Sequence, residues 1–205
     1  MIELFGDATG NSRRAAIALE ESGLAYEPRK VALARGEHRA AEYLQLNPTG
    51  RVPTLVDSDG PEGERLVLTQ SNAIMLYIAE KSGTLLPSTG VERARASEWF
   101  FFLVTDVIAP SLQAFVLNRD PTAAHGEAAS RLNERALAFY DHVNLRLADR
   151  PFLAGSAFTL ADIAGYTITT AFETQLQWDA LPHARRWFDH VGARPAVQRG
   201  RHVFG

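Results

Sequence analysis

The chain has 205 residues, enough for one large domain or two small ones, each with its own hydrophobic core. Hydrophobic residues make up 46% of it and charged residues 22%, a balance typical of globular proteins that excludes the disordered and collagen-like classes. The net charge is −3 and the arginines are spread along the chain. Nucleic-acid binding therefore has little support.

The chain contains no cysteine, which excludes disulfides, thiolate metal sites and a thiol nucleophile of the protein's own. The six histidines are scattered, so we expect no metal. The N-terminus runs directly into a strand pattern at Ile2 to Phe5, without the regions of a signal peptide, and we expect a cytoplasmic protein. The most apolar window, Trp99 to Ile108, is too short to cross a membrane, so no membrane partner is expected.

Short strand-like and helical runs alternate in the first eighty residues, which is typical of an α/β layer. In order, we expect a strand, a helix, a strand, a short irregular helix, two antiparallel strands and a third helix. These elements are predicted at Ile2–Phe5, Arg13–Ser22, Tyr26–Val31, Gly36–Leu46, Pro53–Val56, Arg65–Leu68 and Ser71–Lys81.

Small and turn-forming residues from Ser82 to Gly90 interrupt this periodicity, which favours a domain boundary there. We therefore predict an α/β domain at residues 1–81, a linker at 82–91 and an all-helical domain at 92–205.

The helical part should begin with a long apolar helix from Glu92 to about Leu117, kinked or broken at Pro110 because proline lacks the N–H that a helix uses. Three more helices are predicted by apolar residues at helical spacing. They are expected at Gly126–Ala148, Leu160–Thr174 and Pro182–Val191.

Four separated motifs narrow the interpretation further. They are Thr-Gly-Asn-Ser-Arg at residues 9–13, Asn-Pro-Thr-Gly-Arg-Val-Pro at 47–53, Gln-Ser-Asn-Ala-Ile at 70–74 and the capping-box pattern Phe-Thr-Leu-Ala-Asp-Ile at 158–163. Each is weak alone, but in this order, on this succession of elements, the chain resembles a cytosolic glutathione transferase over essentially its whole length. The resemblance is to bacterial, theta-, nu- and beta-like forms. It implies a thioredoxin-like glutathione-binding domain (βαβαββα) and a helical-bundle domain that contributes a hydrophobic substrate pocket.

The second motif ends in Val52-Pro53 at the start of a strand. An X-Pro bond costs only about 0.5–1 kcal/mol to hold in cis, and a proline there cannot donate a ladder hydrogen bond. The resemblance implies a cis bond, with the backbone of Val52 pairing with the cysteinyl unit of glutathione as an added strand does. The alternative is an ordinary trans proline in a turn.

Gln70 and Ser71 stand where a strand passes into a helix, so backbone N–H groups there should point toward an anion. The resemblance implies that both bind the γ-glutamyl unit of glutathione, although Ser71 could simply cap the helix. His38 and Arg51 are candidates for binding the glycine carboxylate, because a cation complements it. Either could instead be an ordinary surface residue.

The first motif is predicted to carry the chemistry. A thiol is mostly protonated at neutral pH, so an enzyme must stabilise the thiolate with donors placed where its charge forms. Thr9, Asn11 and Ser12 supply donors at the start of a helix, whose dipole favours a negative sulfur. We rank them as catalytic candidates in that order, and Ser12 is the one most expected to be only a helix cap.

The predicted function is a detoxifying glutathione transferase that joins the thiolate of glutathione, its co-substrate, to hydrophobic electrophiles. A glutathione-dependent disulfide reductase or peroxidase is one alternative, which the resemblance of the Thr9-x-Asn11 spacing to nu-like forms implies. A non-catalytic interaction protein of the same fold is another. The apolar residues of Arg93–Leu117 and the family's habit predict a homodimer in which Asp106 reaches the partner's bound glutathione. The sequence does not identify the electrophile.

Overall fold

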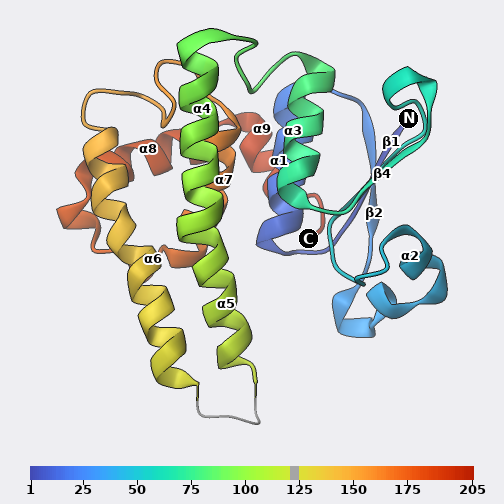
Figure 1. The fold of residues 1–205 in the computed structure, drawn as a ribbon, viewed down its shortest axis with the longest axis horizontal. Coiled ribbons are helices and arrows are strands. Elements are labelled where there is room, and N and C mark those ends of the chain that lie inside the picture. Colours follow the sequence, from blue (N-terminus) through green and yellow to red (C-terminus); the bar gives the residue numbers. More distant parts are fainter. Residues whose placement is uncertain (121–124) are drawn as a thin grey trace. The chain divides into compact units, whose positions relative to one another are not determined.

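The computed structural model describes residues 1–120 and 125–205 and divides into two compact units (Figure 1). Unit 1 consists of residues 1–86 and 193–205, and unit 2 of residues 87–192. The break after Leu86 lies inside the predicted linker. The C-terminal segment, which we predicted to belong to the helical part, instead belongs to unit 1.

Unit 1 has the predicted thioredoxin-like order of strands and helices, with one further helix at its C-terminal end. Its elements are β1 (Ile2–Gly6), α1 (Gly10–Ser22), β2 (Tyr26–Lys30), α2 (Ala41–Leu46), β3 (Thr54–Asp57), β4 (Leu66–Leu68), α3 (Ser71–Ser82) and α9 (Pro195–His202), with 3₁₀ turns at Leu33–Arg35, Glu37–Arg39 and Pro61–Gly63. The irregular helix expected at 36–46 is thus one 3₁₀ turn and a short α-helix.

The four strands form one mixed sheet in the order β2-β1-β3-β4, with β1 parallel to β2 and antiparallel to β3. Helices α1 and α3 lie on one side of this sheet and α2 on the other (Figure 1). Successive side chains of β1 point to opposite faces of the sheet, which fits the placing of helices on both faces. Leu4 is completely buried, whereas the ring of Phe5 lies 6.4 Å from that of Tyr43 in α2.

Helix α9 was not predicted, because it is short and mostly polar. It packs closely on α1: a Cβ atom at Gly200 would lie 2.6 Å from the Cα atom of Ile17, so glycine is required there. Arg194, just before the helix, forms two hydrogen bonds with the carboxylate of Glu21, at 2.6 and 2.7 Å. These contacts explain why the C-terminal segment belongs to unit 1.

The regular elements that the structure describes in unit 2 are all helical. It contains α4 (Gly90–Phe102), a π-helical segment (Leu103–Ile108), α5 (Ala109–Asn118), α6 (Gly126–Arg146), α7 (Leu160–Phe172), a 3₁₀ turn (Trp178–Ala180) and α8 (Pro182–Gly192). The long helix, which was expected to kink or break at Pro110, does not break there. The hydrogen-bond spacing widens to the π pattern just before this proline, and the helix continues.

The centre of unit 2 is α7, which is buried along almost its whole length. A Cβ atom at Gly165 would lie 3.0 Å from side-chain atoms of Leu153 and Trp187, so the neighbouring elements approach this helix very closely. The predicted capping box at its start is confirmed: Thr159 and Asp162 bind each other's backbone.

Residues 90–118 form one helical stretch that is long and apolar enough to cross a membrane by length and composition, longer than the window expected from the sequence. A core helix passes the same test, and Trp99, Phe100 and Val107 are indeed buried here. Other apolar side chains of this stretch are exposed. We call these the exposed apolar face, consisting of Phe101, Leu112, Phe115 and Val116.

Candidate functional site

The strand register brings three of the predicted motifs to one end of the sheet in unit 1. Phe5, near the end of β1, pairs with Thr54, the first residue of antiparallel β3. Leu68, the last residue of β4, pairs with Leu55 of β3. The loop after β1, the turn before β3 and the start of α3 therefore meet at this end. These segments carry the predicted catalytic, cysteinyl and γ-glutamyl residues.

Thr9 is the N-cap of α1, with an extended backbone (φ −111°, ψ 154°), and its hydroxyl oxygen accepts a hydrogen bond from the Ser12 N–H at 3.2 Å. The same hydroxyl donates to the Ser12 oxygen at 3.0 Å. The capping role expected for Ser12 therefore belongs to Thr9, because Ser12 is already inside the helix and completely buried.

Asn11 faces Arg14, one turn further along α1. The guanidinium of Arg14 donates to the Asn11 Oδ1 at 2.9 Å and to the Ser71 Oγ at 3.2 Å. A guanidinium has only hydrogen-bond donors, so the amide oxygen of Asn11, and not its nitrogen, must face Arg14. The Asn11 Nδ2 therefore points away from Arg14. This Nδ2 has no hydrogen bond to the described residues.

Arg14 itself was not predicted as a site residue. It is 3% exposed, and burial lowers the pKa of its guanidinium to about 10, a range in which it stays charged at neutral pH. It joins the predicted catalytic motif on α1 to the predicted γ-glutamyl motif on α3. The sequence alone does not indicate that Arg14 is buried, because an arginine beside Arg13 in a helical run more often lies at the surface.

Asp7 fixes the loop that leads from β1 to α1. Its two carboxylate oxygens accept the N–H groups of Ala8, at 2.9 Å, and Leu33, at 2.8 Å. The hydrogen bond from Leu33, followed by smaller effects including that of Ala8, lowers the pKa of Asp7 below its usual range. The carboxylate therefore stays ionised and holds the loop before Thr9.

The Val52–Pro53 bond is cis, as predicted. The turn before it is held by buried Asn47, whose Nδ2 donates to the Arg51 carbonyl oxygen at 2.6 Å while its Oδ1 accepts from Thr49. The hydroxyl of Tyr43 also donates to the Arg51 carbonyl oxygen, at 2.6 Å. This network fixes the backbone of the turn next to Val52.

His38 and Arg51 belong to segments that touch. A Cβ atom at Gly50, which has φ +58°, would lie 2.9 Å from the His38 carbonyl oxygen, so the 3₁₀ turn of His38 rests on the turn before β3. The His38 Nδ1 is buried and has no hydrogen-bond partner within the described part of the chain. The side chain of Arg51 is exposed.

Gln70 is the N-cap residue of α3 but makes no capping hydrogen bond with its side chain. Ser71 is the first residue of the helix, and its hydroxyl oxygen accepts from Arg14 instead of capping the helix end. The alternative reading of Ser71 as a simple cap is therefore wrong. The first N–H groups of α3 remain available at the end of the sheet where the three motifs meet.

Comparisons with known proteins agree with this geometry. Residues 10–81 match the model of the glutathione S-transferase N-terminal domain, and residues 104–195 that of the glutathione S-transferase C-terminal domain. The disulfide-bond oxidoreductase YfcG of Escherichia coli is 33% identical over 200 residues, which cover 96% of this chain and 93% of YfcG. The chain belongs to the glutathione S-transferase family.

Two further relatives show the breadth of the family around this chain. Glutathione S-transferase 3 of Zea mays is 33% identical over 215 residues, which cover 97% of this chain and 92% of the maize protein. A crystal structure of a glutathione transferase family member from Pseudomonas fluorescens, with two glutathione molecules bound, superposes with a TM-score of 0.88. It is 27% identical, and the match covers 98% of this chain and 92% of that one. The predicted family and fold are confirmed.

Proposed function

We propose that this glutathione transferase binds glutathione at the end of the unit 1 sheet and stabilises its thiolate with the Asn11 amide and the Thr9 hydroxyl. The observation that carries the proposal is the hydrogen bond from Arg14 to the Asn11 Oδ1, at 2.9 Å. It turns the Nδ2 donor of Asn11 outward at the positive end of the α1 dipole, where a negative sulfur is favoured.

Thr9 would contribute by a rotation of its hydroxyl. In the structure its proton is directed to Ser12 while its oxygen accepts the Ser12 N–H. A hydroxyl has one proton, so donating to a thiolate requires it to turn away from the Ser12 oxygen, which keeps a hydrogen bond from the Asp7 N–H at 3.3 Å. We therefore rank Asn11 above Thr9 as the thiolate donor and place Ser12, completely buried, last.

The remaining predicted residues would bind the rest of the tripeptide. Gln70 and Ser71, at the start of α3, suit the γ-glutamyl carboxylate, with the Arg14 charge close behind the Ser71 hydroxyl. Val52, before the cis Pro53, suits backbone pairing with the cysteinyl unit. The glycine carboxylate would lie at the His38 and Arg51 side, where the exposed guanidinium of Arg51 supplies a cation.

Thiol–disulfide exchange is the reaction with the best support. The thiolate attacks one sulfur of a disulfide, forms a mixed disulfide with glutathione and expels the other sulfur as a thiolate. A second glutathione then releases the remaining thiol as glutathione disulfide is formed. Because the chain has no cysteine, glutathione must supply both electrons. The similarity to YfcG, a protein named as a disulfide-bond oxidoreductase, favours this reaction.

Conjugation to a hydrophobic electrophile is the second candidate, favoured by the equal identity to the maize transferase. It uses the same thiolate, which attacks an electrophilic carbon and displaces a leaving group. The two reactions therefore differ in the electrophile and not in the activation of sulfur. Both depend on the residues at the start of α1.

The test compares Asn11→Ala, Asn11→Asp and Thr9→Ala with the wild type for reduction of a small disulfide and for conjugation of an activated aryl halide. The ultraviolet absorbance of the thiolate gives the pKa of bound glutathione. We expect Asn11→Asp to raise this pKa most, because it replaces the donor with a negative charge while an oxygen still faces Arg14. An unchanged pKa in both Asn11 variants would contradict the proposed role.

We also propose that the protein is a homodimer that buries the exposed apolar face of the long helix of unit 2. The phenylalanines Phe101 and Phe115 are 53% and 55% exposed, unusual for a soluble surface unless another chain covers it. Asp106, on the same stretch, would then reach the partner's glutathione. Phe115→Glu should convert a dimer to a monomer in light scattering, with an unchanged circular dichroism spectrum. A wild-type monomer would refute the proposal.

A further inference from the structure

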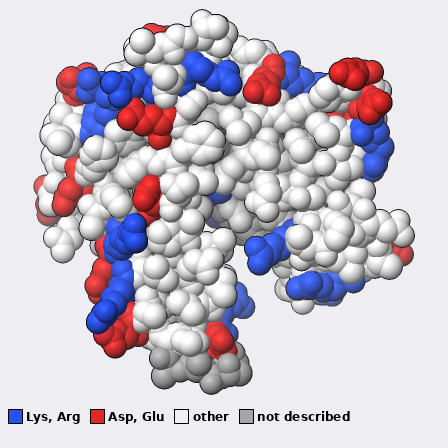
Figure 2. All heavy atoms as spheres, viewed as in Figure 1, with Lys and Arg blue, Asp and Glu red and all other residues white. Residues whose placement is uncertain are grey.

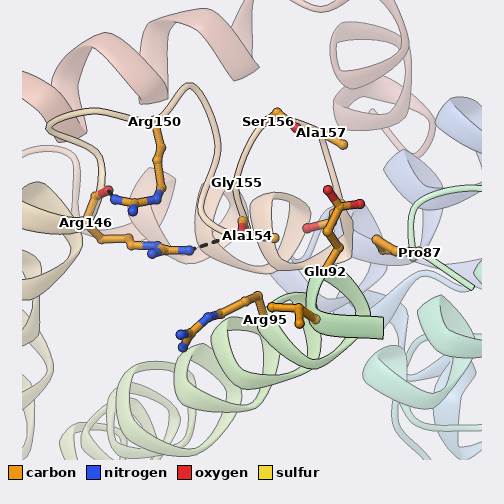
Figure 3. A pocket seen from close by; sticks show the side chains of 11 residues that line it. Pro87, Glu92, Arg95, Arg146, Arg150, Ala154, Gly155, Ser156 and Ala157 are labelled. Carbon is orange, nitrogen blue, oxygen red and sulfur yellow. Dashed lines mark hydrogen bonds between the residues drawn. The ribbon is translucent and has the colours of Figure 1, made fainter. Parts of the chain in front are cut away.

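A group of arginines in unit 2 lies outside everything assigned so far. In Figure 2, basic side chains gather over the start of α4 and the loop that follows α6, with acidic side chains beside them. At this place the surface is hollowed into a pocket of about 280 Å³. Its wall includes Arg95 of α4, Arg146 at the end of α6, Arg150 in the loop and the backbone of residues 154–157 (Figure 3).

Arg146 is held in place by the protein itself. Its Nε donates to the Leu153 carbonyl oxygen at 2.8 Å and its Nη2 to the Ala154 carbonyl oxygen at 3.1 Å. Its guanidinium lies over the ring of Trp99, 5.4 Å from the centroid. It has no carboxylate partner within residues 1–120 and 125–205. Its charge is therefore fixed beside the pocket without a counterion.

The other two arginines have carboxylate partners at the surface. Arg95 pairs with Glu98 at 2.8 Å, with side chains 54% and 56% exposed, and Arg150 pairs with Asp149. Exposed pairs of this kind contribute only about 0–1 kcal/mol, so either arginine can turn to an anion at little cost. Burial lowers the pKa of Arg146, and the charges of Arg150 and Arg95 lower it further while those of Glu98 and Asp149 oppose the shift. Arg146 therefore lies close enough to both other arginines to feel their charges.

Glu92 is the one acidic residue of the pocket wall, so the wall carries three positive charges against one negative. In Figure 3, Glu92 lies on the opposite side of the pocket from Arg146 and Arg150. An anion bound among the arginines would therefore avoid this carboxylate. The far side instead suits a hydroxyl or ammonium group of the same molecule.

We propose that this pocket binds a small organic acid, with a phosphate or carboxylate group held among Arg95, Arg146 and Arg150. Guanidinium groups bind both anions through paired N–H donors, which favours them over metal or sugar ligands for such a wall. The volume is at the low end for ligand pockets, so the ligand has only a few carbon atoms. All residues of the pocket belong to unit 2, and the proposal does not depend on glutathione binding in unit 1.

The test is calorimetric titration of the whole protein, in a buffer without phosphate, with glycerol 3-phosphate, succinate and uncharged glycerol. We expect at least one of the two acids, but not glycerol, to bind at millimolar concentration or below, and added salt to weaken the binding. The acid that binds more tightly identifies the preferred anionic group. Absence of binding by both acids at millimolar concentration would overturn the proposal.

Two kinds of variant locate the binding. The double variant Arg95→Gln with Arg150→Gln removes two charges from the pocket. The variant Ala157→Trp keeps all three arginines but fills the pocket. Each of these two proteins should bind the acid at least about tenfold more weakly, or 1.4 kcal/mol. The matched control is Arg131→Gln with Arg135→Gln, which removes two exposed charges near the other end of α6 and should leave the affinity unchanged. Equal loss in the control, or no loss in either pocket variant, would overturn the proposal.

Discussion

The guanidinium of Arg14 donates a hydrogen bond to the side-chain oxygen of Asn11 at 2.9 Å. Both residues lie on the first turns of α1, three positions apart, where side chains of a helix are neighbours. The same nitrogen of Arg14 reaches Ser71 on α3. One buried side chain thus sets the direction of the proposed thiolate donor and joins it to the proposed γ-glutamyl site.

Replacing Arg14 should therefore impair both binding and chemistry. Arg14→Leu places an apolar side chain in the buried position and leaves the Asn11 and Ser71 oxygens without the hydrogen bonds that Arg14 donates. Each unsatisfied buried group costs about 1–3 kcal/mol, partly offset because a buried charge is also removed, so we expect a net loss of about 1–3 kcal/mol in the free energy of unfolding.

We further expect turnover with glutathione to fall more than about tenfold in Arg14→Leu, since Asn11 can then rotate away from the sulfur. Denaturant unfolding and steady-state kinetics measure the two effects separately. Arg65→Leu, an exposed arginine in unit 1, is the control and should change neither. Normal kinetics in a destabilised Arg14→Leu would show that Arg14 supports only the fold.

Thr9 offers a second test, because it caps α1 as well as facing the proposed sulfur position. Thr9→Ala removes the oxygen that accepts the Ser12 N–H and should cost about 0.5–2 kcal/mol of stability. Thr9→Ser keeps the hydroxyl and should restore most of it. Thermal unfolding of the three proteins measures the cap, and their turnover shows whether the hydroxyl also serves catalysis. Equal turnover in all three would limit Thr9 to capping.

The sequence predicted the elements of unit 1 well, because strand and helix periodicities alternate there and Gly23 ends the first helix in a left-handed conformation. The cis bond before Pro53 and the capping box of Thr159 and Asp162 were also predicted. The capping box is local, since it depends on a few neighbouring residues, whereas the cis bond was implied by the family resemblance. Family motifs supplied the rest of the fold.

Features that depend on distant contacts could not be predicted in this way. Helix α9 lacks a strong apolar pattern and is stabilised by packing of Gly200 on Ile17. The burial of Arg14 depends on α3, and the chain passes through Pro110 without a break because a π segment precedes it. Sequence periodicity records none of these arrangements. The order of Asn11 and Thr9 as candidates changed for the same reason.

The turn before Pro53 provides a third prediction. Asn47 is completely buried and uses both ends of its amide, donating to the Arg51 carbonyl oxygen and accepting from Thr49. Asn47→Ala leaves Thr49 without its acceptor and the Arg51 carbonyl oxygen with only the hydrogen bond from Tyr43, so it should lower the free energy of unfolding by about 1–3 kcal/mol. Because the turn positions Val52, the affinity for glutathione should fall as well.

Calorimetric titration of glutathione into Asn47→Ala, at a temperature where the variant is folded, measures this second effect. Asn47→Asp is the matched variant: it keeps the acceptor for Thr49 but places a buried carboxylate oxygen against the Arg51 carbonyl oxygen, so at neutral pH its loss should be at least as large as that of Asn47→Ala. Full affinity in Asn47→Ala would mean that the cis turn is held without this side chain, for example by the bond from Tyr43 to Arg51.

The last prediction concerns Asp162, the buried carboxylate at the start of α7. It accepts hydrogen bonds from the N–H groups of Leu153, Thr159 and Trp187, each at 2.9 Å, and a longer one from the Thr159 hydroxyl. Burial opposes the charge more strongly than these donors favour it, and the pKa of Asp162 rises from 3.8 to about 6.

The raised pKa of Asp162 fixes the sign of the pH effect. The folded protein holds this proton more tightly than the unfolded chain, so the contribution of the group to stability is complete below about pH 3.8 and is lost as the pH rises through about 6. A difference of about two pH units corresponds to roughly 3 kcal/mol.

Other carboxylates titrate in the same range, so the effect must be measured against a variant in which position 162 does not titrate. Asp162→Asn is that variant. Denaturant unfolding of both proteins between pH 4 and pH 7 should show the wild type losing roughly 3 kcal/mol relative to Asp162→Asn. A constant difference across this range would mean that the four hydrogen bonds hold the carboxylate ionised in spite of its burial.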